Sequence, residues 1–327
     1  MSQIRVGFVG AGNVTKLHLE GISRHPDRAK VVAFCDPDES NIKARMEAFG
    51  ECDAYSNLDD MISKAEIDVA IACTPTSIRR PIVLPLIEAK IPTLCEKPFT
   101  DNYDDAALIE KAAREAGVPV AVNQNFRRNF PFYIAREILA KGELGRPLHI
   151  AQCVNGMRTD KGWRLDCKRY VMSVMSIHWF DGYRWMLQDE AETVYCRGIN
   201  SPATQGGEDT AISAVLTFCG GTVVSLTESF SSFTRQRGCT LDCEKGGLVL
   251  NQSGLTEIRS GADPIEHKNP LDRPDGSFIL LEDLWKASQE GREPETSVSD
   301  NINNIRILEA AYRSWNEERV VRLEELQ

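Results

Sequence analysis

The stretch IRVGFVGAGNVTKLHLEGI, residues 4–22, contains two patterns in succession. Residues 4–10 form a short apolar run with β-branched side chains, which indicates a buried strand. In the remainder, Val14, Leu17 and Ile22 recur near helical spacing. Two glycines stand between these patterns. The stretch therefore predicts a strand, a tight turn and a helix.

The glycine spacing suits the binding of a dinucleotide. In such a turn Gly10 would permit the sharp bend, and Gly12 would let the backbone approach a pyrophosphate that rests on the helix N-terminus. We expect Asn13 and Val14, at the start of the helix, to lie beside the same cofactor. Thr15 replaces the third glycine of the usual motif, and its bulk is expected to keep helix and strand further apart.

An aspartate ends the next predicted strand, KVVAFCD at 30–36. A carboxylate at this place accepts hydrogen bonds from the ribose hydroxyls of NAD and repels the additional phosphate of NADP. The residue after Asp36 is Pro37 and not an arginine. We therefore expect NAD, with NADP less favoured. The alternative is an ordinary α/β unit with a surface aspartate.

Strands and helices continue to alternate up to residue 125. Further strands are predicted at 67–75, 93–98 and 118–125, and further helices at 41–49, 78–90 and 104–117. This alternation predicts an α/β fold, a Rossmann domain with a doubly wound parallel sheet. Ligands of such sheets bind beyond the carboxyl ends of the strands.

Most polar residues that need an explanation fall at this carboxyl edge. Besides the glycines and Asp36, they are Thr74, Pro75, Glu96, Lys97, Asn123 and Asn125. Lys97 stands between an apolar strand and a proline, so it cannot continue the strand ladder. Its ammonium is expected to point into the ligand crevice, although a surface lysine at the start of a loop is the alternative.

The second part of the chain has a different pattern. Successive strands are predicted at 146–156, 191–200, 210–230, 239–252 and 255–260, with helices at 132–145, 280–291 and 301–318. Gly220-Gly221 and Gly246-Gly247 are expected to form hairpin turns. We therefore predict two domains, 1–123 and 124–327, the second an α+β domain with a large, mostly antiparallel open sheet. If one face of that sheet is apolar and uncovered, we expect it to be buried against another copy of the chain in a homodimer or homotetramer.

One further predicted helix, VMSVMSIHWFDGYRW at 171–185, is apolar almost all the way round. His178 lies in its middle, and Asp181 follows one turn later. His178 could be a core histidine bonded to a backbone carbonyl. Alternatively it is functional, because an imidazole with a pKa near 6.5 suits proton transfer at neutral pH.

Composition restricts the partners. The net charge of −10 argues against nucleic acid or an anionic membrane, which need a basic surface, and favours a small molecule. No apolar run approaches the roughly 20 residues of a membrane span, and the first residues do not resemble a signal peptide, so a cytoplasmic protein is expected. The ten cysteines show no paired spacing, so we expect reduced thiols and no metal site.

Together these features resemble the Gfo/Idh/MocA family of NAD(P)-dependent oxidoreductases. The resemblance rests on GFVGAGNVTKLHLEG, Asp36, ACTPTS, CEKP at 95–98, IHWFDGYRW and GREPETSVSDNINNIRILEAAYRS, in this order along the whole chain. It implies a Rossmann domain, a second domain whose open sheet mediates oligomerisation, and an active site between them. Most members move a hydride between the nicotinamide and a secondary-alcohol carbon of a sugar, polyol or related compound such as a sugar acid.

The resemblance also implies roles for single residues. Lys97 matches the catalytic lysine and His178 the helix histidine, which we expect to act as electrostatic or proton-transfer partner and as base. Thr74 and Pro75 match the stretch beside the cofactor, and Glu96 the carboxylate near the nicotinamide ribose. Further residues that the resemblance places in the cleft are Asn123, Asn125, Arg127, Trp163 and Arg164, the last two as contacts for cofactor or substrate. Apart from the resemblance, Arg127, Arg164 and Tyr170 are candidates to bind substrate hydroxyl or carboxylate groups, with a surface or helix-capping role as the alternative.

Two positions depart from the family pattern. Val174 stands where many members carry an aspartate four residues before the histidine, and Arg79 stands where a histidine is frequent. With Val174 in place of an acid, Asp181 is one candidate to orient the imidazole, although a structural role for it is favoured. Two other functions stay open: an NAD-dependent glycosidase that recycles its cofactor, and a non-catalytic NAD-binding regulator.

Overall fold

The computed structural model describes residues 3–160, 167, 169–204 and 208–326. The chain divides into two compact units, the first made of 1–125 and 272–302, the second of 126–271 and 303–327. The expected boundary at residue 123 lies close to residue 125, where the chain first passes from the first unit to the second. The assignment of everything after it to the second domain was wrong, because 272–302 returns to the first unit.

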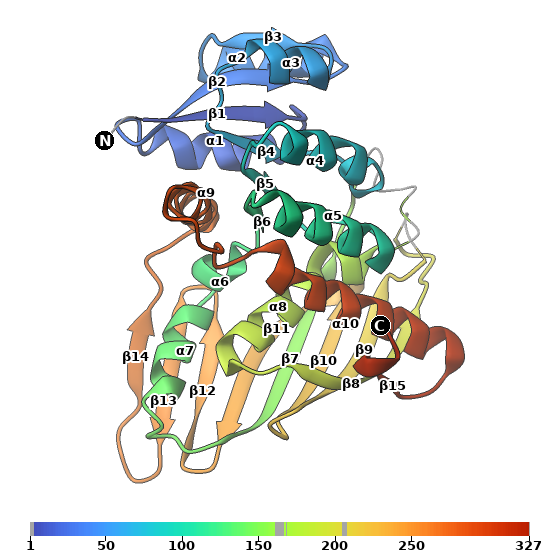
Figure 1. The fold of residues 1–327 in the computed structure, drawn as a ribbon. Helices are drawn as coiled ribbons and strands as arrows, with labels where there is room; N and C mark the ends of the chain where they lie inside the picture. Colours follow the sequence, from blue (N-terminus) through green and yellow to red (C-terminus); the bar gives the residue numbers. More distant parts are fainter. Residues whose placement is uncertain (1–2, 161–166, 168, 205–207, 327) are drawn as a thin grey trace. The chain divides into compact units, whose positions relative to one another are not determined.

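The first unit contains a six-stranded parallel sheet with the order β3-β2-β1-β4-β5-β6 (Figure 1), as the alternation of strands and helices predicts. Its strands are β1 (Ile4–Val9), β2 (Ala29–Cys35), β3 (Asp53–Tyr55), β4 (Val69–Ala72), β5 (Thr93–Cys95) and β6 (Val120–Val122). Its first helices are α1 (Thr15–Ser23), α2 (Glu39–Phe49), α3 (Leu58–Lys64), α4 (Arg79–Glu88) and α5 (Tyr103–Ala116). Sequence patterns missed β3 and α3 because both are too short to show a periodicity.

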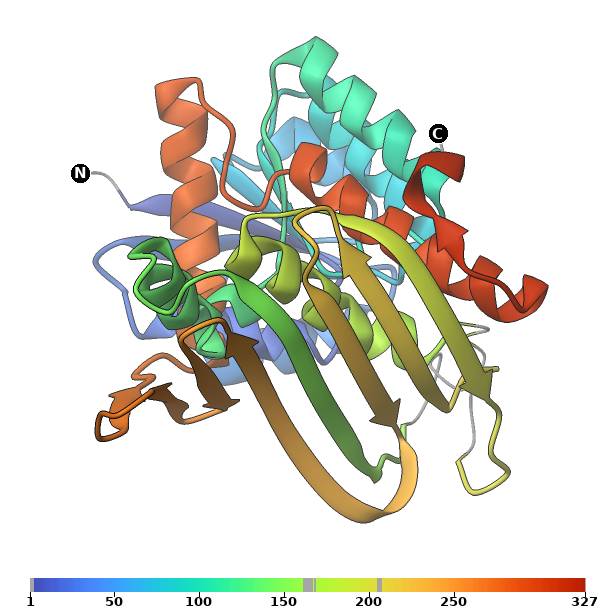
Figure 2. The same ribbon diagram turned by 90° about the horizontal axis from the view of Figure 1, so that it is seen from below.

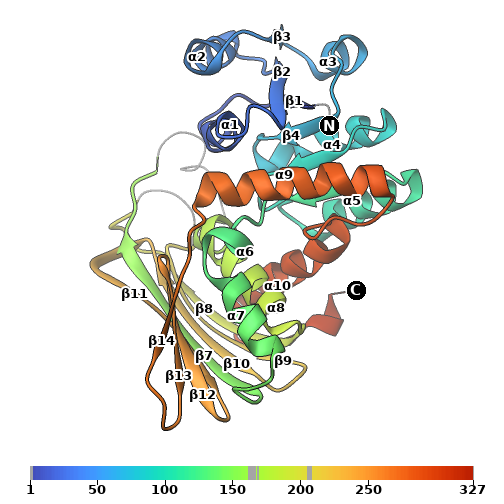
Figure 3. The same cartoon turned by 90° about the vertical axis from the view of Figure 1, so that its left-hand side faces the viewer.

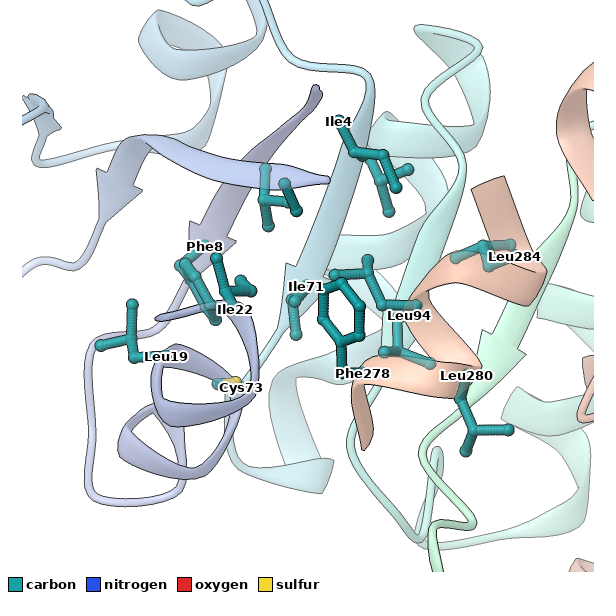
Figure 4. Packing of buried hydrophobic residues seen from close by; sticks show 14 of the residues in the cluster. Ile4, Phe8, Leu19, Ile22, Ile71, Cys73, Leu94, Phe278, Leu280 and Leu284 are labelled. Carbon is teal, nitrogen blue, oxygen red and sulfur yellow. The ribbon is translucent and has the colours of Figure 1, made fainter. Parts of the chain in front are cut away.

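Helix α9 (Arg273–Glu290) completes the core of this unit. Figure 4 shows Phe278, Leu280 and Leu284 of α9 in one apolar cluster with side chains of β1, α1 and β4. Helices α1 and α9 approach closely at Gly21 of α1, where a Cβ atom would lie 2.6 Å from the carbonyl oxygen of Pro274 of α9. Burial of these apolar side chains is the physical reason why the segment 272–302 belongs to the first unit.

The second unit is built on a nine-stranded sheet with the order β14-β13-β12-β11-β7-β10-β9-β8-β15. The strands are β7 (Pro147–Met157), β8 (Ala191–Ile199), β9 (Ala211–Phe218), β10 (Val223–Ser229), β11 (Ser231–Cys243), β12 (Gly246–Asn251), β13 (Gly254–Arg259), β14 (Ile265–Lys268) and β15 (Val321–Arg322). In this sheet, only β7 and β10 pair in parallel among the described strands. The sheet is therefore mostly antiparallel, as predicted.

Helices cover one face of this sheet. Figure 3 shows α6 (Phe126–Asn129), α7 (Phe132–Ala140) and α8 (Ile177–Leu187) on that face. Helix α10 (Val298–Glu317) continues into this unit after residue 302. The opposite face, turned toward the viewer in Figure 2, carries no helix in the described part of the unit. No helix within the described ranges is long and apolar enough to cross a membrane.

The helix that carries His178 differs from the regular helix expected at 171–185. Residues Met172–Ser176 form a π-helical segment, and α8 begins only at Ile177. The buried carboxylate of Asp209 accepts hydrogen bonds from the backbone N–H groups of Tyr170 (2.6 Å) and Met172 (2.9 Å) and so holds the start of the segment. Because a π-helix has a wider turn than an α-helix, position 174 does not have the α-helical relation to His178 that the sequence suggests.

Candidate active site

The glycine turn follows β1 with the geometry expected for a dinucleotide site. Gly10 has a φ of +93°, and a Cβ atom there would lie 2.9 Å from the backbone of Cys73, so only glycine fits. Around Gly12, in contrast, an added Cβ would meet no atom within 4 Å. Thr15 does not loosen the packing as expected: it is fully buried, and its hydroxyl donates a 2.9 Å hydrogen bond to the Gly10 carbonyl.

Asp36 is tied to this turn. Its carboxylate accepts hydrogen bonds from the backbone N–H groups of Ala11 (2.7 Å) and Asp38 (2.9 Å). Asn41 Nδ2 also donates to it, at 3.4 Å. A carboxylate offers about four acceptor positions, so one is left for a ribose hydroxyl. Arg45 donates from Nε to the Ala11 carbonyl at 3.1 Å on the other side of the turn. Asp36 is thus a buried part of the turn and not an ordinary surface aspartate.

Arg79 connects the ends of β4 and β5. The guanidinium of this buried arginine donates to the hydroxyl of Thr74 (3.1 Å) and to the backbone carbonyls of Thr74 and Glu96. It therefore holds Thr74 and Pro75, two residues expected beside the cofactor, against the strand end that carries Lys97. Sequence analysis treated Arg79 only as a departure from a family pattern. No local signal reveals its role, because the contacts depend on the folded sheet.

Glu96 is the centre of a buried polar network at the same edge. Its Oε1 accepts hydrogen bonds from His18 Nε2 of α1 (2.7 Å) and from Asn123 Nδ2 beyond β6 (2.8 Å). Burial alone would raise the pKa of Glu96, but the bond and charge of His18 and the amide of Asn123 lower it. Burial opposes protonation of His18, but the Cys73 sulfur and Glu96 outweigh it and raise its pKa. The pair is therefore ionic at neutral pH.

Lys97 directly follows this network and precedes a cis peptide bond to Pro98. Two amide oxygens lie at the end of β6 in the same unit. The Nδ2 groups of Asn123 and Asn125 donate to Glu96 and to Ser277, whereas the structure gives neither Oδ1 atom a hydrogen-bond partner within the described residues. Buried carbonyl oxygens of this kind can accept from the hydroxyl or amide groups of a ligand.

In the second unit, the imidazole of His178 has a fixed ring plane. It stacks on Phe126 with ring centroids 4.0 Å apart and an interplanar angle of 6°. Phe126 in turn meets the edge of Trp179 at 5.1 Å. The stack on the face of Phe126 therefore orients the plane of the imidazole ring.

Two residues that were expected to contact substrate form buried polar contacts within the second unit. Arg127 forms a buried two-pronged ion pair with Asp181, at 2.8 and 2.6 Å, and Asn304 of α10 donates to the same carboxylate at 2.8 Å. Tyr170 is fully buried, and its hydroxyl donates to Asp160 at 2.5 Å. The predicted substrate contacts of Arg127 and Tyr170 stay predictions. Asp181 is bound by Arg127 and Asn304, which agrees with the structural role favoured for it.

Other expectations have a simpler outcome. Asn13 is exposed, and Val14 precedes the first residue of α1, so both lie at the helix start as predicted. Trp163 and Arg164 lie outside the described residues. All ten cysteines are free thiols, and six of them are buried. No group of acidic, histidine and cysteine side chains in the described ranges has an arrangement that could hold a metal ion.

Comparison with protein families matches both units. Residues 4–124 match the model described as oxidoreductase family, NAD-binding Rossmann fold, and residues 132–249 match the GFO/IDH/MocA C-terminal domain. The chain is also 30% identical to the inositol 2-dehydrogenase 4 of Saccharopolyspora erythraea, covering 80% of this chain and 77% of that protein. The chain belongs to the Gfo/Idh/MocA oxidoreductase family.

Other relatives of this oxidoreductase span its full length. The D-apiose dehydrogenase of Paraburkholderia graminis is 25% identical and covers 100% of this chain and 92% of the relative. A crystal structure of an oxidoreductase from Agrobacterium radiobacter, in complex with NAD+, L-tartaric acid and magnesium, covers 100% of both chains with a TM-score of 0.88 and 19% identity. The structural likeness supports the fold of both units.

The residues of the first unit fit an NAD molecule. The open side of Gly12 leaves room for a pyrophosphate, and Asp36 keeps an acceptor position for a ribose hydroxyl. Asn123 and Asn125 each present a buried amide oxygen without a partner in the described part of the unit. The oxidoreductase thus has, on one sheet edge, the groups that its NAD-binding family requires.

Substitution of Gly12 tests the cofactor site apart from the fold. In Gly12→Ala the new methyl group meets no protein atom, so we expect an unfolding free energy near that of the wild type. The same methyl would occupy the space where the backbone approaches the pyrophosphate. We expect the affinity for NAD to fall about tenfold or more, measured by calorimetric titration. An unchanged affinity in a stable variant would place the pyrophosphate elsewhere.

The ion pair of His18 and Glu96 predicts a pH-dependent stability. His18→Asn removes one partner of a buried pair and should destabilise the oxidoreductase by roughly 3–5 kcal/mol. Because the folded-state pKa of His18 is raised, its contribution is complete below pH 6.5 and is lost as the pH rises through the folded-state value. The difference in unfolding free energy between the wild type and His18→Asn, measured in urea, should therefore be larger at about pH 6 than at about pH 9. An equal advantage at both values would contradict the ion pair.

Proposed function

We propose that this oxidoreductase transfers a hydride between NAD and a secondary-alcohol carbon of a sugar, an inositol-like polyol or a sugar acid. In the proposal His178 is the base, and Lys97 is its electrostatic and proton-transfer partner. The observation that carries the proposal is the stacked, oriented imidazole of His178 in a chain whose other unit has a complete dinucleotide edge. Relatives named as inositol and D-apiose dehydrogenases support the substrate class.

Each group has a defined task in the oxidation of an alcohol. NAD, when bound, accepts the hydride. The hydroxyl proton must leave as the hydride departs, so a base within hydrogen-bond reach is required, and a neutral imidazole is suited to this near pH 7. The ammonium of Lys97 would stabilise the negative charge that develops on the alcohol oxygen. The stack on Phe126 would keep the His178 ring in the orientation that proton transfer needs.

The remaining residues of the first unit would hold the cofactor and orient the substrate. We assign NAD contacts to Gly10, Gly12, Asn13, Val14, Asp36, Thr74, Pro75, Glu96, Lys97 and Asn125, and a substrate contact to Asn123. NAD is preferred over NADP in this proposal because the Asp36 carboxylate, fixed at the turn by Ala11 and Asp38, would repel a phosphate on the adenosine ribose.

The main test is the formation of NADH from a panel of inositols, sugars and sugar acids, followed by absorbance. We expect net NADH with at least one member of the panel and little or no activity with NADP. Lys97→Met and His178→Ala should each lower turnover by about 100-fold or more. NAD binding should stay within about threefold of the wild type, because neither change removes the glycine turn.

Matched controls are available in both units. Lys111→Met changes an exposed lysine on α5, and His149→Ala changes a partly buried histidine on β7; both should retain wild-type turnover. Turnover without net NADH, accompanied by exchange of substrate hydrogen with solvent, would identify a glycosidase that recycles its cofactor. Wild-type turnover in Lys97→Met or His178→Ala would overturn the assigned roles.

We further propose that the open face of the nine-stranded sheet forms a homodimer or homotetramer. The face without helices includes Tyr195, Val215, Val249 and Ile258, each between 38% and 43% exposed. Burial of such a face against a second copy removes apolar surface from water. Sedimentation should show an oligomer for the wild type, and Val215→Glu combined with Ile258→Glu should shift it toward monomer. A monomeric wild type at micromolar concentration would contradict the proposal.

A further inference from the structure

Strand β10 carries a buried carboxylate on the face that the helices cover. Its inward positions alternate as Val224, Leu226 and Glu228, and the side chain of Glu228 is fully buried. A carboxylate in this position costs free energy unless hydrogen bonds compensate for the lost water. A glutamine or an apolar residue would satisfy the packing at a lower cost, so the contacts of Glu228 need an explanation.

Both oxygens of Glu228 are bound by residues that flank His178. Oε2 accepts a 2.6 Å hydrogen bond from the hydroxyl of Ser176, two residues before the histidine. Oε1 accepts a 3.2 Å hydrogen bond from the indole Nε1 of Trp179, the residue directly after it. The chain on both sides of His178 is therefore tied to one side chain of the sheet.

The same carboxylate also acts on the imidazole ring through aromatic contacts. Trp179, fixed by Glu228, meets Phe126 edge to face at 5.1 Å, and Phe126 stacks on His178 at 4.0 Å. Ser176 is the last residue of the π-helical segment, so the first hydrogen bond anchors the point where the helix changes its turn. A shift at either bond would be transmitted to the position or to the plane of the imidazole.

We propose that Glu228 is a positioning residue for His178, acting through Ser176 and Trp179. The proposal rests on the function proposed above, in which His178 is the base. A base displaced by a fraction of an ångström loses rate while substrate and cofactor still bind, because only the proton transfer depends on its placement. The role of Glu228 should therefore be visible in kcat and not in KM.

Glu228→Gln tests this inference with little change in volume. The terminal amide nitrogen cannot accept a hydrogen bond, so one of the two contacts is lost. We expect kcat to fall about 10- to 100-fold, with KM and the dissociation constant of NAD within about threefold of the wild type. Because proton transfer becomes slower, the solvent deuterium isotope effect on kcat should increase. A loss of folded enzyme alone lowers kcat without changing the isotope effect.

Glu257→Gln is the matched control. Glu257 is 3% exposed, lies on β13 of the same sheet, and bonds to Arg259 and His267 and not to α8. Its substitution should leave kcat and the isotope effect unchanged.

Ser176→Ala is a smaller change that removes one hydrogen-bond donor to Glu228. It should lower kcat several-fold with the same rise in the solvent isotope effect. If Glu228→Gln does not fold, this variant tests the positioning role in its place.

The outcomes separate this inference from the proposed function. If His178→Ala retains turnover, the proposed function fails and the positioning role fails with it. If His178→Ala is inactive but Glu228→Gln or Ser176→Ala keeps the wild-type kcat and isotope effect, only the positioning role is overturned. A reduced kcat with an unchanged isotope effect also overturns it, because Glu228 would then support folding alone.

Discussion

The buried carboxylate of Glu96 joins three segments of the first unit: α1 through His18, the end of β6 through Asn123, and β5 through its own backbone. Without a counter-ion, a buried carboxylate would be strongly disfavoured, so the pairing with His18 is a condition for the whole edge. Arg79 adds a second connection by binding the carbonyl of Glu96 and the residue that follows β4. Together these bonds fix the strand ends between which a dinucleotide and Lys97 must be arranged.

The second unit holds His178, the proposed base, by a related principle. The helix around His178 is apolar, and the few charges near it are buried and bound: Asp181 by Arg127 and Asn304, and Glu228 by Ser176 and Trp179. Aromatic packing by Phe126 then sets the ring plane. In both units, a rigid polar network lies next to the proposed reactive group, and this limits its motion more than an apolar contact alone would.

Local patterns in the sequence predicted most of the longer helices and strands but not the contacts between distant residues. The alternation of strands and helices, the Gly10–Gly12 turn and the position of Asp36 depend on neighbouring residues, and the structure agrees with them. The ion pair of Arg127 with Asp181 could not be predicted, because the two residues lie 54 positions apart in the sequence. The return of 272–302 to the first unit, the π-helical segment before α8 and the roles of Arg79 and Glu228 likewise depend on contacts between distant residues, which periodicity does not encode.

In the proposed reaction, this oxidoreductase transfers a hydride from an alcohol carbon to NAD and releases NADH as a net product. Its most direct test uses the panel substrate with the highest turnover, deuterated at its carbinol positions, and mass spectrometry of the cofactor recovered after the reaction. The account predicts NADH that carries one deuterium, in an amount equal to the oxidised substrate. Recovery of unlabelled NAD together with substrate that has exchanged its deuterium for solvent hydrogen would contradict it.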